Sequence, residues 1–293
     1  MVGSVEQIEY DIAALEKAVG KLAGELHQAY ATYLNNLGKA IRQQLIMATY
    51  QICTQGHPEE FLELSTSDRQ RLQQLIRQLA QQVQEELRNH LEMPILGKNL
   101  AERIGLAVSP RATNEPRLEA AQPGESGVKP APSLPPDDLL YWQENLEDAI
   151  YQELQVTSHA VNRLLQQFDI LPKQLPEEIL QAEQRSEAML SSSVPNLMNL
   201  LVEVRDERAN LEAELEQEAE LEDSSEVPVI HIVAIHLRLA EIEFTDATVN
   251  TDRTRIRTLV ARLKALNQEH QRKQRDWAIA RAQAAWRATW TEA

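Results

Sequence analysis

The sequence predicts an all-α fold of long amphipathic helices, and three observations support this. Alanine, leucine, glutamine and glutamate, which are all good helix formers, dominate the chain. Aromatic residues make up only 4% of it, which suits seams between helices better than a thick globular core. Apolar residues recur at helical spacing over long stretches. We therefore expect a helical hairpin or coiled coil and a second helical bundle, joined by a disordered, proline-rich linker.

Residues 4–54 are predicted to form one long helix that begins with a heptad repeat. Its apolar positions alternate steps of three and four, the pattern of helices that wrap around one another. This stripe predicts self-association, with the number of strands left open. Gly20 and Gly24 lie one turn apart and are compatible either with close approach of another helix or with a weak point in this one. The residues proposed for self-association are Ile8, Ile12, Leu15, Val19, Leu22 and Leu26.

A second helix is predicted over residues 68–92, with Ser67 as its cap. Gly56 and Pro58 stop the first helix, in the order typical of a helix end. Because the connection is short, the two helices should fold back into an antiparallel hairpin. A short third helix is expected over 99–107. Together these segments form a first module, residues 1–108.

Residues 109–136 are predicted to be a disordered linker. Seven of the thirteen prolines of the chain lie here, with few apolar side chains. Such a segment cannot bury enough apolar surface to offset the entropy lost on ordering. We take it as the boundary between the first module and a second, residues 137–293.

The second module is predicted to be helical over residues 137–168, from 177, over 195–222 and over 252–290. Residues 229–244 are ambiguous, because their β-branched side chains suit a strand. Their apolar positions at 232, 235, 239 and 242 also fit helical spacing. No other segment offers an evident partner strand, and a lone strand leaves its backbone groups unpaired. We therefore favour a helix for this segment.

Charge is distributed unevenly along the chain, which has a formal net charge of −16. Residues 137–226 carry a net charge of −17 and residues 227–293 carry +4. The acidic run 203–226 is interpreted as a solvated face or as a docking surface for a basic partner. The basic last helix would pair with acidic helices, of this chain or of a protein partner, bind a phosphate backbone, or meet an anionic membrane. We favour pairing with acidic helices, within this chain or of a protein partner, and Arg253, Arg255 and Arg257 are the predicted contacts.

Trp286 and Trp290 form a tryptophan pair near the end of this helix. They lie one turn apart, on one face. Tryptophan is enriched at binding hot spots, so the pair is a candidate contact for a partner. The alternative is that the pair folds onto residues 229–244.

No signature of bond-making chemistry is present in the sequence. No two of the seven histidines lie three or four residues apart, and Cys53 is the only cysteine. Nucleophile-elbow and phosphate-loop motifs are missing as well. We therefore predict no catalytic residue, no cofactor and no metal. With no apolar run long enough to span a membrane and no signal peptide in evidence, a cytoplasmic location is expected.

Three segments resemble helical proteins of unassigned function from cyanobacteria. They read QLIMATYQICTQGHPEEFLELS, IHLRLAEIEF and WAIARAQAAWRATW. The resemblance implies a cytoplasmic bacterial protein and carries no activity or functional residues. The sequence thus favours a non-catalytic scaffold or adaptor with a protein partner, and a homo-oligomer through the first helix is also compatible. The alternatives are a nucleic-acid-associated protein acting through the basic last helix and a helical-bundle enzyme or cofactor binder.

Overall fold

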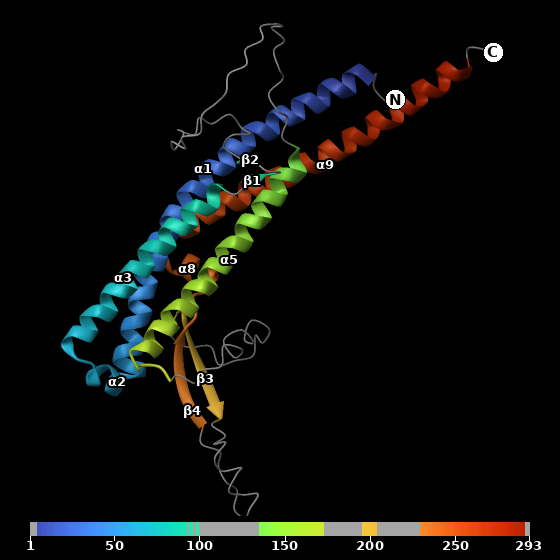
Figure 1. Ribbon diagram of the computed structural model, residues 1–293. Coiled ribbons are helices and arrows are strands. Elements are labelled where there is room, and N and C mark those ends of the chain that lie inside the picture. Colours follow the sequence, from blue (N-terminus) through green and yellow to red (C-terminus); the bar gives the residue numbers. More distant parts are fainter. Residues whose placement is uncertain are drawn as a thin grey trace, which may run out of the picture. The chain divides into compact units, whose positions relative to one another are not determined.

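The computed structural model describes residues 5–92, 94–95, 98–99, 135–172, 195–203 and 229–290, and it is mostly helical (Figure 1). This confirms the predicted fold class. The long helices are α1 (Val5–Gln51), α3 (Thr66–Asn89), α5 (Pro136–Gln167) and α9 (Ala247–Trp290). The shorter elements are α2 (Pro58–Glu63), α8 (Leu239–Thr245) and the strands β1 (Pro94–Ile95), β2 (Lys98–Asn99), β3 (Leu197–Glu203) and β4 (Val229–Ile235).

The chain divides into two compact units, each assembled from separated segments. Unit 1 contains Met1–Leu37, Glu85–Tyr151 and Ala247–Ala293, and unit 2 contains Gly38–Gln84 and Gln152–Asp246. Helices α1, α3 and α5 therefore contribute to both units. The predicted modules, 1–108 and 137–293, each supply segments to both units as well. Residues 109–134 of the predicted linker lie outside the described residues, so the linker stays a prediction.

Helix α1 confirms the long helix predicted over residues 4–54. It passes into a single π-helical turn, Ile52–Gly56, in which the His57 N–H donates to the Ile52 carbonyl at 2.7 Å. Pro58 then starts α2 at a position where its missing N–H leaves no hydrogen bond unmade. Most heptad positions of α1 are buried, with Val19 and Leu26 completely inaccessible to solvent, while Ile12 and Leu15 are half-buried.

Helix α3 confirms the second predicted helix, although its cap is Ser65 and not Ser67. The Ser65 Oγ accepts a hydrogen bond from the Asp68 N–H at 3.1 Å, which satisfies one of the free donors of the first turn. Arg69 fastens α2 to α3 by donating to the carbonyls of Phe61 and Leu62, at 3.2 and 2.6 Å. The two predicted long helices of the first module are thus connected by a short, well-bonded corner.

Within unit 2, the backbone of α1 at Gly38 lies close to Gln84 of α3. A Cβ atom at this position would lie 2.8 Å from the Cγ and 3.2 Å from the Cα of Gln84. Gly20 and Gly24 have no such neighbour, because a Cβ at either would meet nothing within 4 Å. The described residues therefore give no support for close helix approach at Gly20 and Gly24. Such an approach occurs at Gly38 instead.

The core of unit 1 is formed by α1, α5 and α9. Aromatic rings fill its centre: Tyr30 packs edge-on against Trp142 at 5.7 Å and against Tyr33 at 6.3 Å. All three side chains are buried. Helices α5 and α9 confirm the helices predicted over 137–168 and 252–290.

The prediction of a helix over residues 229–244 is wrong for its first half. Residues 229–235 form strand β4, which pairs antiparallel with β3 from Leu197↔Ile235 to Glu203↔Val229. The partner strand that the sequence did not reveal is Leu197–Glu203. This segment was predicted as the start of a helix over 195–222, so that prediction is wrong over residues 197–203. A segment of seven residues is too short for periodicity to separate a strand from a helix. The second half of the segment is helical, as α8.

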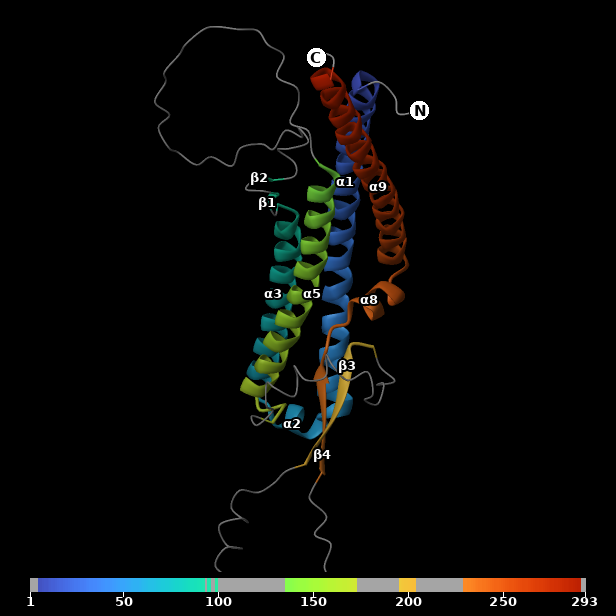
Figure 2. The same cartoon turned by 90° about the vertical axis from the view of Figure 1, so that its right-hand side faces the viewer.

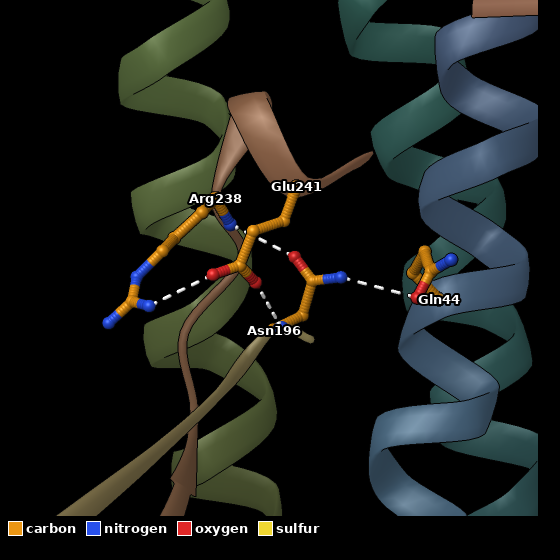
Figure 3. A network of polar contacts seen from close by, with 4 residues as sticks. All are labelled: Gln44, Asn196, Arg238 and Glu241. Atoms are coloured by element: carbon orange, nitrogen blue, oxygen red, sulfur yellow. Dashed lines mark hydrogen bonds and ion pairs between the residues drawn. The ribbon is translucent and has the colours of Figure 1, made fainter. Parts of the chain in front are cut away.

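A polar network fixes this hairpin to helices of unit 2. Asn196, just before β3, is fully buried and has a left-handed backbone with φ of 61°. Its N–H donates to the Glu241 carboxylate, its Nδ2 donates to Gln44 at 3.2 Å, and its Oδ1 accepts from the Arg238 N–H at 3.0 Å (Figure 3). Its carbonyl accepts from the His236 N–H at 3.0 Å. Every polar group of Asn196 is thus engaged, which offsets the desolvation of a buried amide.

A second amide holds the end of β4 to α5. The Asn162 side chain accepts from the Ile235 N–H at 2.9 Å and donates to the Ile235 carbonyl at 2.8 Å. The Ser158 hydroxyl, one turn earlier, accepts from the Leu237 N–H at 3.0 Å. These side chains satisfy backbone groups that the two-stranded sheet leaves unpaired.

Other predicted segments fall mostly outside the description. Asn99 lies in β2, so the helix predicted over 99–107 is wrong at its first residue, and residues 100–107 lie outside the described residues. The helix predicted from residue 177 and residues 204–222 of the helix predicted over 195–222 also lie outside them.

We predict opposite effects for two glycine-to-alanine substitutions in α1. Gly24→Ala should raise the free energy of unfolding by up to about 1 kcal/mol, because alanine is the better helix former and has open space there. Gly38→Ala should lower it by about 1–3 kcal/mol, because the new methyl group overlaps Gln84. Urea unfolding followed by circular dichroism measures both. Equal effects of the two substitutions would show that α1 and α3 are not in close contact at Gly38.

Substitutions of Asn196 should separate its hydrogen bonds from its backbone conformation. Asn196→Gly should cost about 2 kcal/mol, because both side-chain hydrogen bonds are lost while the positive φ remains unstrained. Asn196→Ala should cost about 1 kcal/mol more, because a Cβ disfavours the left-handed region. Thermal unfolding and amide hydrogen exchange in β3 and β4 measure the difference. Identical stabilities for the two variants would contradict the left-handed conformation.

Candidate interaction surface

The face of α1 predicted for self-association is packed within a single chain. Ile8, Val19, Leu22 and Leu26 are buried in unit 1, and the remaining members of the stripe, Ile12 and Leu15, are half-buried. A second copy of the chain would therefore have to displace side chains already in contact in order to use this face. Self-association through α1 stays a prediction, without a free apolar stripe to support it.

Arg253, predicted as a partner contact, is directed into unit 1. Its guanidinium forms an ion pair with Glu147 of α5 and lies 5.6 Å from the centre of the Tyr33 ring. The side chains of Arg253 and Glu147 are only 16% and 15% exposed. The Tyr30 hydroxyl donates to the same carboxylate. The Glu147 carboxylate thus accepts hydrogen bonds from both α1 and α9. Arg253 stabilises the interior of unit 1 through this ion pair.

Burial and the neighbouring charge keep the Tyr30 hydroxyl protonated. Burial raises the pKa of Tyr30 well above its ordinary value, and the Glu147 carboxylate raises this pKa further because a phenolate beside it would be repelled. The hydroxyl is therefore a permanent hydrogen-bond donor to Glu147. Arg255 and Arg257, the other arginines predicted as contacts, are both exposed on α9.

Helix α9 contacts α1 through Lys273 and Trp277. Lys273 donates to Asp11 at 2.6 Å, and the Trp277 indole donates to Glu9 at 2.9 Å. The hydrogen bond from Lys273 is the main reason that the pKa of Asp11 lies below its ordinary value. Glu9 contacts Trp277, and the two helices run antiparallel. Val5, the first residue of α1 and one turn before Glu9, is therefore about level with Arg281, one turn after Trp277. Beyond that level, no described residue of α1 lies beside α9.

The end of α9 exposes a tryptophan pair. Every residue from 281 to 290 is exposed, and Trp286 and Trp290 are 66% and 70% exposed. Their ring centres are 5.7 Å apart with an angle of 37° between the planes. Trp286 comes nine residues after Trp277, about two and a half turns, and so faces away from the side of α9 that contacts α1. Residues 229–244 belong to unit 2, so the alternative in which the pair folds onto them stays a prediction.

The surroundings of the pair are apolar and basic. Ile279 is also exposed and, with Gln283 and Arg287, lines a shallow hollow beside Trp286. Residues 279–290 contain two arginines and no acidic residue. We name the surface formed by Ile279, Gln283, Trp286, Arg287 and Trp290 the tryptophan surface.

Sequence reasoning identified the tryptophan pair but missed the cluster around Glu147. Tyr30, Glu147 and Arg253 are far apart in the chain and belong to no recognisable motif. The one available signal is a glutamate on the otherwise apolar face of the predicted helix 137–168. Arg253 and Arg255 look alike in the sequence, and only the packing of α9 against α5 separates a buried arginine from an exposed one.

Within the described part of the chain, no group of three or more histidine, cysteine, aspartate or glutamate side chains is placed to hold a metal ion. No described helix has both the length and the apolar character needed to cross a membrane. No protein-family model, curated protein or solved structure matches the chain. The fold places the chain among predominantly helical proteins built on long packed helices, and its function has to be inferred from its surface chemistry.

Removing the charge of Glu147 should destabilise unit 1. Glu147→Gln leaves the largely buried Arg253 without its anionic partner, and we expect a loss of about 3 kcal/mol in the free energy of unfolding. The matched control is Glu25→Gln. Glu25 of α1 forms an exposed ion pair at 3.8 Å with Arg262, which lies on α9 like Arg253. That control should lose less than about 1 kcal/mol. Urea unfolding of both variants decides the matter, and a similar small loss in both would show that the Glu147 pair is not a structural contact.

Proposed function

We propose that this protein is a non-catalytic helical scaffold that docks a protein partner on the tryptophan surface. The observation that carries the proposal is the exposure of Trp286 and Trp290 on a helix end that has no described neighbour. The partner would present apolar side chains, because Ile279 and the two indoles form most of the tryptophan surface.

The energetics of two exposed indoles support a docking role. Burial of apolar surface contributes roughly 25 cal/mol per Å², and large aromatic side chains carry more of this surface than any other residue. Single exposed apolar residues are ordinary in soluble proteins, but a contiguous apolar patch commonly marks an interaction site. The patch here joins Ile279 to the tryptophan pair along one face of α9.

The contacts of α9 with α1 and α5 within unit 1 would give the tryptophan surface a defined position. Arg253 pairs with Glu147, Asn267 donates to Asp137 at 2.7 Å, and Lys273 reaches Asp11. These contacts are spread along the helix and join it to both α5 and α1. A binding surface on a helix held in this way loses little conformational entropy when a partner docks, which is the physical advantage of a scaffold.

Nucleic-acid binding is a second candidate because Arg255 and Arg257 are exposed on the same helix. Such arginines can contact a phosphate backbone, and binding would then weaken steeply with salt. The formal net charge of −16 opposes this role. Protein docking on the tryptophan surface is therefore the better-supported proposal.

The proposal predicts that partner capture depends on the indoles and not on exposed aromatic area in general. A photoreactive benzoylphenylalanine at position 283, inside the hollow beside Trp286, should cross-link a discrete protein in native cells. Trp286→Ala with Trp290→Ala should reduce this cross-link by at least about tenfold, as expected for a pair of hot-spot residues. Mass spectrometry identifies the captured protein.

Phe244 supplies the matched control, because it is 84% exposed and lies outside the tryptophan surface. Phe244→Ala should leave the cross-link unchanged, and both variants should keep the wild-type unfolding midpoint, since exposed substitutions rarely matter for stability. Capture that survives the double tryptophan substitution would refute the proposal. Retention of nucleic acid that disappears with salt and with Arg255→Gln and Arg257→Gln would favour the second candidate instead.

A further inference from the structure

In unit 2, helix α2 connects the end of α1 to α3 (Figure 2). A separate cavity is lined by residues of these elements. Its volume is about 350 Å³, within the range of small-molecule sites in proteins. Cys53, Leu72 and Ile76 are buried and form its floor, while Ile46 and Tyr50 are partly exposed and form its rim. The cavity belongs to a different part of the chain from the tryptophan surface.

The buried part of the cavity wall is apolar in effect, and the polar side chains of Tyr50 and Gln73 lie at its exposed side. Two threonines line it, but the Thr49 hydroxyl donates to the Leu45 carbonyl and the Thr54 hydroxyl donates to the Tyr50 carbonyl, each at 2.8 Å. Neither hydroxyl proton is left for a ligand. Burial raises the pKa of the Cys53 thiol to about 11, so this side chain is neutral at physiological pH. The interior therefore suits a hydrocarbon body.

One formal charge stands at the cavity, the guanidinium of Arg77 on the exposed side of α3. Among the described residues, Arg77 has no hydrogen-bond or ion-pair partner. The nearby Arg69 is engaged, because it donates to two carbonyls and lies 5.4 Å from the centre of the Phe61 ring. A guanidinium is the side chain best shaped to bind a carboxylate with two parallel hydrogen bonds.

We infer that this cavity binds a small amphipathic carboxylate, with its hydrocarbon chain over Cys53 and Ile76 and its anionic head on Arg77. The apolar interior favours a ligand with a hydrocarbon chain, and the guanidinium of Arg77 favours a negatively charged head group. This inference is independent of the proposed docking function, because the residues of the two surfaces do not overlap.

The only cysteine of the chain lies in the floor of this cavity, which makes it a site-specific reporter. Decanoate should slow the alkylation of Cys53 by N-ethylmaleimide at least fivefold, in a saturable manner and below the concentration at which decanoate forms micelles. Decyltrimethylammonium, which has the same chain and the opposite charge, should protect at least tenfold less well at equal concentration. Calorimetric titration of the full chain gives the decanoate affinity independently of the thiol.

Two variants separate the head-group contact from the cavity itself. Arg77→Gln should weaken decanoate binding roughly fivefold, the size of an exposed charge pair, and leave decanol binding unchanged. Arg71→Gln is the matched control, because Arg71 is exposed on the same helix and does not line the cavity. Ile46→Trp at the partly exposed rim should block entry and abolish the calorimetric signal, with circular dichroism and the unfolding midpoint confirming that the variant is folded.

The inference is overturned if saturating decanoate neither protects Cys53 nor produces heat on titration. It is also overturned if decanoate, decanol and decyltrimethylammonium bind equally and Arg77→Gln changes none of them. That result would describe an apolar groove without head-group selection. These outcomes leave the tryptophan surface untouched, since its test uses different residues and a different readout.

Discussion

The Glu147 carboxylate joins the helices of unit 1 at one point. It accepts from Tyr30 of α1 and pairs with Arg253 of α9, while Glu147 itself belongs to α5. Each of these polar groups would be costly to bury alone, so the three side chains stabilise one another only when all three helices are in place. The aromatic packing of Tyr30 against Trp142 depends on the same alignment.

This alignment also determines which surface α9 exposes. Once Arg253 is held by Glu147 and Lys273 by Asp11, the rotation and the register of α9 are set. The residues that face inward are then Ile256, Leu263 and His270, at spacings of seven. Trp286 and Trp290 follow on another face, beyond the level at which α1 begins. A surface chemistry suited to docking is thus a consequence of how the interior of unit 1 is paired.

Unit 2 is organised differently, because side-chain amides form the hydrogen bonds to backbone groups that neighbouring strands would form in a larger sheet. Asn196 and Asn162 satisfy backbone and side-chain groups around a hairpin of only two strands. Close to the π-helical turn against which β4 packs, α2 forms a corner that Arg69 holds to α3 and that leaves an apolar cavity beside Cys53. The corner thus carries the cavity inferred to bind a small carboxylate, whereas the hairpin held by amides is a structural element.

The sequence by itself determined the long helices, because apolar spacing repeated over many turns has only one secondary-structure interpretation. It also singled out the tryptophan pair. Tertiary structure alone decided that residues 197–203 and 229–235 are strands, because each is short and the pairing that stabilises it comes from elsewhere in the chain. It alone separated Arg253 from Arg255, and it buried the heptad stripe of α1 that looked free for self-association. The physical reason is common to these cases: local pattern specifies a backbone conformation, while exposure depends on which distant segment packs against it.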